Sequence, residues 1–446
     1  MSTILVLGAG LSSSSLIRYL LNNSASQGWT IRVVDQSLDL VKSKINGNPN
    51  GVALSFNALD RTERKPEIEK ADLVISMLPA RFHVEVAEDC IDLKKNLITP
   101  SYISPEMAAL NDRAKEAGII IMNEIGVDPG IDHMSAMKII NQVKGRGGKF
   151  KSFKSFTGGL IAPESDDNPW NYKFTWNPRN VVLAGQGGAA SFIRNGEYKY
   201  IPYNRLFGRL DYISVENYGD FVGYANRDSL SYRETYELQD IPTIFRGTLR
   251  RPGYCESWNV FIELGMTDDT YAMVGTETMT PRRFLNAFLP YDANKKVEDK
   301  FREFIREERK HLYDKFEWLG LFKDEPIVGL EKATPAQVLQ KILVDKLSLK
   351  EGDKDMIVMV HEFEYELGDE KHKIISHMVN IGEDQVYTSM SNTVGLPVGI
   401  CAKLILNNTI TDKGVTLPVK KHLYEPILEE LETFDIKFVE KELVLS

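Results

Sequence analysis

The alternation of short apolar runs with helical segments in the first third of the chain is the feature that most constrains the fold. Ile4–Leu7 is an apolar run, a glycine turn follows it, and Leu16, Tyr19 and Leu20 then recur at helical spacing. The runs "WTIRVV", "ADLVIS", "NLIT" and "IIIMNEIG" repeat this rhythm, with helical segments between them. Nearly continuous apolar strands alternating with helices are typical of a parallel sheet covered on both faces.

The glycine turn and Asp35 together indicate a dinucleotide site. Gly8 permits a tight turn, and Gly10 lets a pyrophosphate approach the N-terminus of the next helix, where unpaired N–H groups favour anions. Ser13 replaces the third glycine of the usual pattern, so the turn alone also fits any helix-opening glycine turn. Asp35 ends the second strand, where a carboxylate accepts hydrogen bonds from an adenosine ribose.

Asp35 also favours one cofactor over the other. A carboxylate beside the ribose repels a 2′-phosphate, and Gln36 follows it instead of an arginine. The sequence therefore favours NAD(H) over NADP(H). The alternative is that Asp35 merely caps the following helix.

Three strand ends carry polar residues that could form a substrate site. His83 follows one strand, Ser101 and Tyr102 follow the next, and Asp128 and His133 follow the third. Ligands of open α/β sheets bind at the carboxyl ends of the strands, so we expect these loops to converge near a nicotinamide. Each loop also fits an ordinary turn or helix cap.

The remaining residues predict further domains. Residues 130–280 and 351–390 read as a mixed α/β domain, and residues 281–350 as an inserted helical subdomain. Residues 391–446 contain the apolar helical segment "LPVGICAKLIL", which we expect to return to an N-terminal Rossmann domain at residues 1–129. The expected class is thus α/β, with a Rossmann domain, a substrate and dimerisation domain, and a helical insertion.

Composition excludes several classes of partner. The net charge of −9 over 446 residues argues against a nucleic-acid or anionic membrane surface. Three widely separated cysteines, Cys90, Cys255 and Cys401, fit neither a disulfide framework nor a zinc site, so we expect a cytoplasmic protein without a metal. No run approaches 18 consecutive apolar residues and the N-terminus reads as a strand, so we expect no membrane span and no signal peptide.

Several segments together resemble the saccharopine dehydrogenase family, the glutamate-forming enzymes also called saccharopine reductases. They are "NLITPSYISPEM", "MNEIGVDPGIDHMSAMKII", "GGLIAPESDDNPWNYKFTW", "GYANRDSLSY" and "IFRGTLRRPGY". The resemblance implies a homodimer that oxidises saccharopine with a nicotinamide cofactor and water to L-glutamate and 2-aminoadipate 6-semialdehyde, or runs the reverse condensation.

The resemblance also implies which positions bind ligands. Those for substrate are Ser101, Tyr102, Asp128, Arg227, Thr248, Leu249 and Arg250. Those for cofactor are Gly8, Gly10, Leu11, Ser12, Asp35, Gln36, Ser37, Ser76, Met77, Leu78, Val127 and Pro129. Fungal members of the family carry a cysteine-arginine pair in place of Asp35-Gln36, a departure that further favours NAD here.

Residue chemistry fits a substrate with three carboxylates. Arg227, Arg246, Arg250 and Arg251 lie in two neighbouring segments, and arginine suits bidentate carboxylate binding. Asp128 opens a helix, which favours its ionised form, so we expect it to anchor the substrate ammonium.

The roles of acid and base stay open at the level of sequence. Tyr102 could donate a proton from its phenol, and His133 falls about one turn into the helix. The expected catalytic residues are Asp128 and Tyr102, without one assigned general base. Two alternatives remain: an enzyme like carboxynorspermidine or carboxyspermidine dehydrogenase, whose cationic substrate would need more acid near residues 227–251, and a non-catalytic NAD-binding protein.

Overall fold

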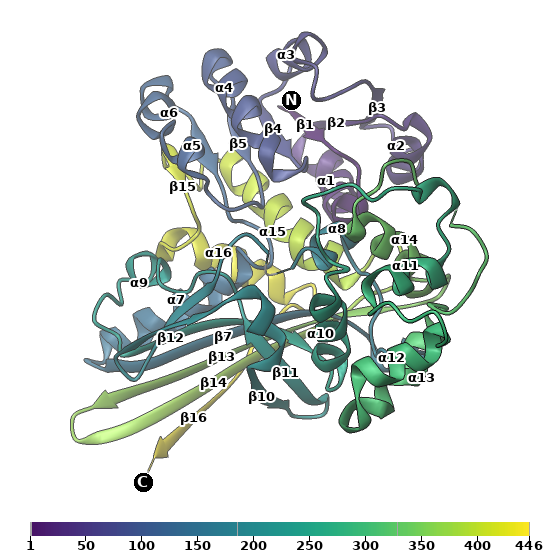
Figure 1. Ribbon diagram of the computed structural model, residues 1–446. Helices are drawn as coiled ribbons and strands as arrows, with labels where there is room; N and C mark the ends of the chain where they lie inside the picture. Colours follow the sequence, from purple (N-terminus) through teal and green to yellow (C-terminus); the bar gives the residue numbers. More distant parts are fainter. Residues whose placement is uncertain (1, 185, 328, 446) are drawn as a thin grey trace. The chain divides into compact units, whose positions relative to one another are not determined.

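The computed structural model describes residues 2–184, 186–327 and 329–445. The chain forms two compact units (Figure 1). Unit 1 comprises Met1–Phe150, Glu234–Leu238 and Met359–Ser446, and unit 2 comprises Lys151–Arg233 and Gln239–Val358. The four segments expected from the sequence divide the chain differently, and their boundaries stay a prediction.

Unit 1 contains the parallel sheet expected from the first third of the chain, and the prediction of a Rossmann-like domain is confirmed. The strand order is β15-β6-β5-β4-β1-β2-β3, and every pairing is parallel. The strands are β1 (Ser2–Leu7), β2 (Trp29–Asp35), β3 (Gly51–Ser55), β4 (Leu73–Ser76), β5 (Asn96–Ile98), β6 (Ile120–Met122) and β15 (Gly414–Thr416). This order places the end of β1 beside the ends of β2 and β4, where a dinucleotide binds in such sheets.

The helices of unit 1 include those that connect and cover this sheet. They are α1 (Ser14–Gln27), α2 (Leu38–Ile45), α3 (Arg61–Glu69), α4 (His83–Leu93), α5 (Pro105–Ala108), α6 (Asn111–Ala117), α7 (Ile131–Gly145), α15 (Ser389–Leu406) and α16 (Lys421–Glu432), with short 3-10 turns η1 (Leu11–Ser13) and η2 (Ala80–Phe82). Fully buried side chains of the sheet, such as Leu5, Val74 and Ile121, pack with Val86 and Cys90 of α4 in one hydrophobic core.

Helix α15 packs closely against α1. A Cβ at Gly395 would lie 2.8 Å from the backbone nitrogen of Leu16, and one at Gly399 would lie 2.6 Å from Tyr19, so glycine permits the approach of the two helices. By length and composition alone α15 could cross a membrane, although 72% of that stretch is buried within the protein. Small polar residues interrupt its apolar ones, and the expectation of no membrane span stays a prediction.

The second sheet has the order β10-β11-β12-β7-β13-β14-β16, and β8 pairs with β12 and β9. Its strands are β7 (Lys149–Ile161), β8 (Ala190–Arg194), β9 (Glu197–Ile201), β10 (Leu210–Val215), β11 (Gly219–Ala225), β12 (Thr243–Arg250), β13 (Asp355–Leu367), β14 (Glu370–Ile381) and β16 (Val439–Leu445). Strand β7 joins β12 in parallel, so the sheet is mixed, as the sequence predicts.

Helical segments of unit 2 lie mostly after residue 250. They are η3 (Pro163–Ser165), α8 (Pro178–Val182), η4 (Tyr203–Gly208), α9 (Tyr232–Thr235), α10 (Tyr254–Leu264), η5 (Thr276–Thr278), α11 (Pro281–Phe288), α12 (Val297–Ile305), η6 (Glu307–Leu312), α13 (Tyr313–Trp318) and α14 (Pro335–Leu347); α9 continues into the Glu234–Leu238 piece of unit 1. Trp170 anchors an aromatic core here, stacked on Phe261 at 5.6 Å and edge-on to Phe316 at 5.6 Å. The segment "NPWNYKFTW" therefore contributes packing as well as any binding role.

Candidate functional site

The glycine turn after β1 offers backbone groups to a phosphate. Gly8 has φ +103°, and a Cβ there would lie 3.0 Å from the carbonyl oxygen of Met77, so this position requires glycine. Gly10 precedes η1, and a Cβ at Gly10 would meet no atom within 4 Å, which leaves this side of the turn open. Of the next two predicted residues, Leu11 is exposed and Ser12 half-buried. The turn thus fits a dinucleotide pyrophosphate.

The carboxylate of Asp35 is bound by the protein itself. Its Oδ2 accepts a hydrogen bond from the Ala9 backbone N–H at 2.9 Å, and its Oδ1 accepts one from the Ser37 N–H at 3.3 Å. Gln36 and Ser37 are exposed beside it, and the Ser37 side chain caps α2 by accepting from the Leu40 N–H. Asp35 therefore holds the backbone of the glycine turn by a hydrogen bond, in addition to any contact with a cofactor ribose.

Lys44 of α2 brings a positive charge to the same turn. Its ammonium donates to the Gly10 carbonyl oxygen and lies 3.4 Å from the Ser13 hydroxyl. Burial lowers the pKa of Lys44 to about 8, and the charge of Asp35 opposes that shift. The sequence analysis did not identify Lys44; a basic residue on the helix after the second strand was the available signal.

The other predicted cofactor residues lie at the ends of β4 and β6. Ser76 is fully buried and Met77 and Leu78 are half-buried. Val127 is buried at 8% exposure and Pro129 is also buried, in the loop that leads into α7. The Ser76 hydroxyl is hydrogen-bonded to His83. The partly exposed surface at the end of β4 is therefore formed by Met77 and Leu78.

The loop from Gly126 to Gly130 is held by its own backbone. The Gly126 N–H donates to the Pro129 carbonyl at 2.9 Å, and the Ile131 N–H donates to the Gly126 carbonyl at 2.9 Å. Gly130 has φ +146°, and a Cβ there would lie 2.1 Å from the Gly126 oxygen. Only glycine fits this position, and the resulting bend fixes where Asp128 stands.

Asp128 and Tyr102, the two predicted catalytic residues, lie together. The Tyr102 hydroxyl donates to Asp128 Oδ1 at 3.0 Å. Tyr102 is 49% exposed and Asp128 is half-buried, so the pair is accessible to a ligand. Ser101, the neighbour of Tyr102, is also half-buried. The structure thus brings these three predicted substrate residues of unit 1 to adjoining strand ends.

His83 lies beneath Ser101 as the centre of a hydroxyl cluster. The imidazole is only 3% exposed; its Nδ1 lies 2.9 Å from the Ser76 hydroxyl, and its Nε2 lies 2.8 Å from that of Ser101 and 2.9 Å from that of Thr99. Burial lowers the pKa of His83 to about 4, so the ring is neutral at pH 7. His83 was noticed in the sequence but its partners were not, because they come from the ends of two separate strands, β4 and β5.

His133 belongs to a second buried cluster. Its Nε2 lies 2.7 Å from Glu124 Oε2 and its Nδ1 lies 3.0 Å from the Tyr236 hydroxyl. Glu124 Oε1 also accepts from the Ile103 N–H at 2.9 Å, which ties the loop after β5 to α7. Asp132 accepts from the Gly130 N–H at 2.6 Å. Both residues thus support the start of α7.

The predicted arginines belong to unit 2, where Arg250 is buried in an aromatic cage. Its guanidinium carbon lies 5.2 Å from the ring centre of Tyr172, 5.8 Å from that of Tyr224 and 5.3 Å from that of Tyr254. Its Nε has no hydrogen-bond partner among the residues that the structure describes. A buried guanidinium with an unmatched donor fits an anionic ligand.

The other predicted substrate residues and arginines of unit 2 differ in exposure. Arg227 is exposed, Thr248 is half-buried, and the Leu249 side chain is fully buried, so Leu249 can offer a ligand only backbone atoms. Arg246 is 4% exposed and lies over the Tyr232 ring at 3.8 Å, and Arg251 donates to the Tyr218 carbonyl at 2.7 Å. Arg227 and Arg250 therefore remain the better anion-binding candidates.

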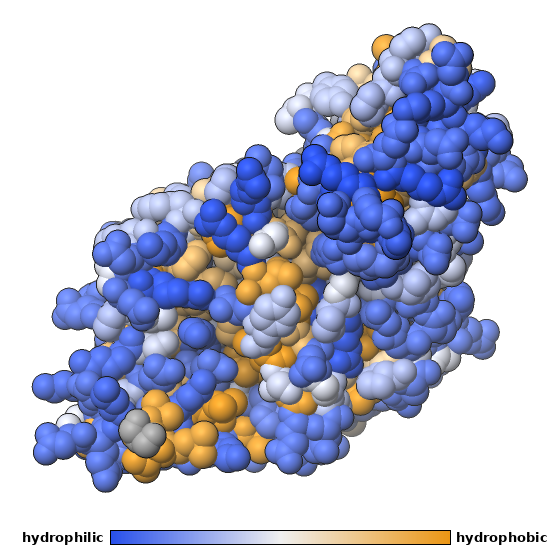
Figure 2. Space-filling model, turned by 60° about the horizontal axis from the view of Figure 1, so that its bottom comes forward, coloured by the Kyte–Doolittle hydropathy of each residue, from blue (hydrophilic) through white to orange (hydrophobic). Residues whose placement is uncertain are grey.

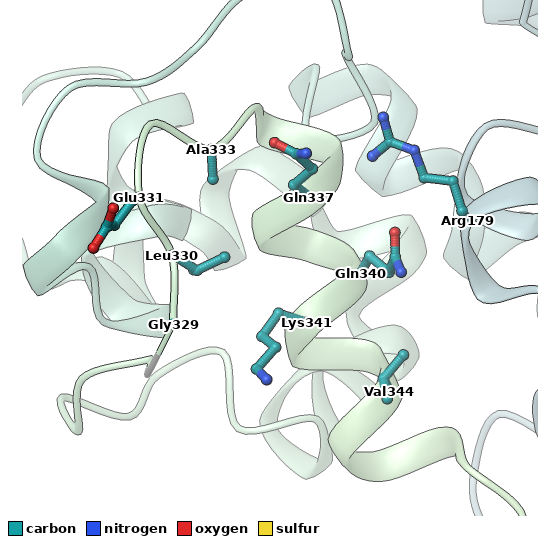
Figure 3. Close-up of a pocket in the computed structure, with 9 residues that line it drawn as sticks. All are labelled: Arg179, Gly329, Leu330, Glu331, Ala333, Gln337, Gln340, Lys341 and Val344. Carbon is teal, nitrogen blue, oxygen red and sulfur yellow. The ribbon is translucent and has the colours of Figure 1, made fainter. Parts of the chain in front are cut away.

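A separate pocket of about 650 Å³ lies in unit 2. It is lined by Arg179, by residues of the segment 329–333 and by residues of α14, among them Gln337 and Lys341 (Figure 3). It shares no residue with the predicted substrate or cofactor positions. Within the described part of the chain, no group of three His, Cys, Asp or Glu side chains could hold a metal ion.

Two family models match successive parts of the chain. The model of the saccharopine dehydrogenase NADP binding domain matches residues 4–122, and that of the saccharopine dehydrogenase C-terminal domain matches residues 126–436. Saccharopine dehydrogenase (NADP(+), L-glutamate-forming) of Schizosaccharomyces pombe is 34% identical over 99% of each chain. The same-named protein of Pyricularia oryzae is 33% identical over 98% of each chain.

A solved structure gives the same result. Apo histidine-tagged saccharopine dehydrogenase (L-Glu forming) from Saccharomyces cerevisiae aligns with a TM-score of 0.90 at 30% identity, covering 99% of this chain and 100% of that one. The likeness therefore extends over both units.

These findings correct the expected cofactor preference. The matched domain is named NADP binding and the relatives are named for NADP(+), so the prediction of NAD(H) over NADP(H) is wrong. The prediction considered Asp35 as an isolated charge. In the structure its oxygens accept backbone N–H groups and the Lys44 ammonium stands at the same turn, which offsets repulsion of a 2′-phosphate. The residues present thus fit NADP(H).

Two family models therefore account for nearly the whole sequence, and full-length relatives share a third of its residues. The chain belongs to the saccharopine dehydrogenase family.

Proposed function

We propose that this protein oxidises saccharopine with NADP(+) and water to L-glutamate and 2-aminoadipate 6-semialdehyde, or catalyses the reverse condensation. The observation that carries the proposal is the Tyr102–Asp128 pair at the strand ends of a chain that resembles named L-glutamate-forming enzymes over its full length. Bound NADP(+) would supply a hydride acceptor. The remaining chemistry concerns the substrate amine, the imine and water.

Asp128 is suited to hold the secondary amine of the substrate. Its carboxylate stands just before the N-terminus of α7, a position that favours the ionised form and hence an ammonium partner. Loss of the amine proton frees the lone pair, and loss of hydride from the adjoining carbon gives an imine. Water then adds to the imine carbon, the C–N bond breaks, and the amine of glutamate leaves with a proton.

Tyr102 is suited to orient Asp128 and to contact the same substrate groups. Its phenol donates to Oδ1 of Asp128, which orients the carboxylate for a substrate ammonium. In unit 2, taken by itself, Arg227 and Arg250 carry guanidinium groups of the kind that bind carboxylates, of which saccharopine has three. Arg250 contributes an unmatched buried Nε donor, whereas Arg227 is exposed to an arriving ligand.

The direct test is absorbance of reduced cofactor when purified protein is mixed with NADP(+) and saccharopine. The proposal expects turnover with saccharopine, and none with a carboxyalkyl polyamine. Asp128→Asn should lower kcat/KM by roughly 100-fold, since the anchoring charge is lost. Tyr102→Phe should have a smaller effect, with kcat/KM lowered about tenfold. Normal turnover and unchanged saccharopine affinity in Asp128→Asn would remove Asp128 from the site.

The proposal includes a homodimer in the cytoplasm. Strand β16 is the last strand of its sheet, and Val439, Leu443, Val444 and Leu445 are all at least 36% exposed on it. Figure 2 shows that hydrophobic residues reach a mainly hydrophilic surface on one face of the molecule. An exposed apolar edge strand is a template for pairing with a second copy. Light scattering of the protein and of Val444→Lys checks this: a monomeric wild type contradicts it.

The cytoplasmic location is supported by the three free, buried cysteines. Fractionation of cells that express the tagged protein checks this part of the proposal.

A further inference from the structure

His83 and its three hydroxyl partners form a hydrogen-bonded chain from the interior of unit 1 to the partly exposed Ser101. Ser76 ends β4, His83 begins α4, and Thr99 and Ser101 follow β5. The buried imidazole contacts all three hydroxyls within 2.8–2.9 Å. A neutral imidazole has one N–H donor and one acceptor nitrogen. The tautomer of His83 therefore decides which of the hydroxyls donate to the ring and which accept from it.

One tautomer sends the chain outward. If Nδ1 accepts from the Ser76 hydroxyl, Nε2 carries the proton and donates to the Ser101 oxygen at 2.8 Å, with Thr99 at 2.9 Å sharing the donor. The Ser101 O–H proton is then free to point away from the ring. Ser76 and Thr99 are fully buried, whereas Ser101 is half-buried, so Ser101 is the member of the cluster that can reach a ligand.

We propose that His83 is a positioning residue which holds the Ser101 hydroxyl as a hydrogen-bond donor to a carboxylate of the substrate. The inference rests on the proposed function and names one contact within it. Aligned donors polarise each other and place the positive end of the chain toward an anion. In the opposite tautomer Nε2 accepts a hydrogen bond; where Ser101 donates it, the hydroxyl presents only an oxygen acceptor, which suits an ammonium and not a carboxylate.

The two side-chain amides provide a matched pair of variants. The amide of His83→Gln reaches the place of Nε2 and can donate to Ser101, whereas that of His83→Asn reaches only the place of Nδ1. Both remain neutral and polar. We expect His83→Gln to keep the saccharopine KM within about threefold of wild type, and His83→Asn and Ser101→Ala each to raise it about tenfold.

A double-mutant cycle separates positioning from a structural role. In the Ser101→Ala background, His83→Asn should add less than about twofold to KM, because the contact through which it acts is already gone. The Kd of NADP(+), measured by titration calorimetry, should stay unchanged in all variants. Thermal unfolding identifies any variant that fails to fold, in which case His83→Gln and Ser101→Ala still decide the question.

Three results would overturn the inference: additive losses in the double mutant, an unchanged KM in Ser101→Ala, or a loss confined to NADP(+) affinity. Each of them leaves wild-type saccharopine turnover intact. Absence of turnover in the wild-type enzyme would instead overturn the proposed function.

Discussion

His83 and His133, two of the buried histidines of unit 1, lie near neighbouring strand ends, and their partners differ in kind. His133 is paired with the carboxylate of Glu124 at 2.7 Å and with the hydroxyl of Tyr236 at 3.0 Å. The ring nitrogens of His83 contact the hydroxyls of Ser76, Thr99 and Ser101. His133 is 1% exposed and His83 is 3% exposed, so burial does not distinguish them.

The difference lies in where each cluster ends. Glu124 and Tyr236 are themselves buried, at 8% and 1% exposure, so the His133 cluster is closed and fixes the loop after β5 to α7. The His83 cluster ends at the half-buried Ser101, next to Tyr102 and Asp128. A histidine paired with a buried carboxylate thus serves the fold, whereas one among hydroxyls can direct a ligand contact.

The largest expected effect comes from the loop that starts the helix of His133. Gly130→Ala places a methyl group 2.1 Å from the Gly126 oxygen at φ +146°, so the loop must open. We expect a loss of more than about 4 kcal/mol in the free energy of unfolding, or no folded protein. Gly28→Ala is the control, because its φ is +69° but no atom lies within 4 Å, and it should cost about 1 kcal/mol. Urea unfolding measures both, and equal losses would contradict the loop argument.

Breaking the closed cluster should destabilise the protein with little change in affinity for saccharopine. His133→Phe leaves the buried Glu124 carboxylate without its imidazole partner, at a cost of about 3–5 kcal/mol. The free energy of unfolding from urea titration should fall by this amount. A variant of normal stability but raised saccharopine KM would reverse the roles assigned to the two histidines.

The His83 cluster predicts a pH dependence of stability. The pKa of His83 is about 4 in the fold against an ordinary 6.5, so the unfolded chain binds more protons between these values. The free energy of unfolding should therefore fall by about 3 kcal/mol as the pH decreases from 6.5 to 4. This contribution is complete above pH 6.5. In His83→Gln that part of the decrease should vanish; an identical pH profile in wild type and variant would show that other groups cause it.

The smallest effect concerns the half-buried Lys44 at the glycine turn. Lys44→Gln should weaken NADP(+) binding about tenfold, or about 1.4 kcal/mol, with less than a threefold change for NAD(+). Its pKa of about 8 implies that the ammonium charge is lost as the pH rises through 8, so NADP(+) affinity should fall between pH 7 and 9. Lys44→Arg should keep the affinity at high pH. Titration calorimetry with both cofactors checks this. Equal losses of affinity for NADP(+) and NAD(+) would show that Lys44 stabilises the glycine turn and does not contact the 2′-phosphate.

The sequence predicted the parts of the fold that depend on local pattern. Apolar strands followed by helices identified the parallel sheet, and Gly8 marked its first turn, because period and backbone freedom are properties of neighbouring residues. The segments "GVDPGIDH" and "NPWNYKFTW" indicated the family. The sequence also brought Ser101, Tyr102 and Asp128 to adjoining strand ends, since parallel strands end on one edge.

Tertiary structure decided what these residues contact. Asp35 predicted the wrong cofactor because the sequence does not show that Ala9 and Ser37 bind its oxygens, or that Lys44 joins it nine residues later. The partners of His83 come from β4 and β5, and those of His133 from residues 124 and 236. Charge and hydrogen bonding depend on distances between chain-remote atoms, and these distances exist only once the chain has folded.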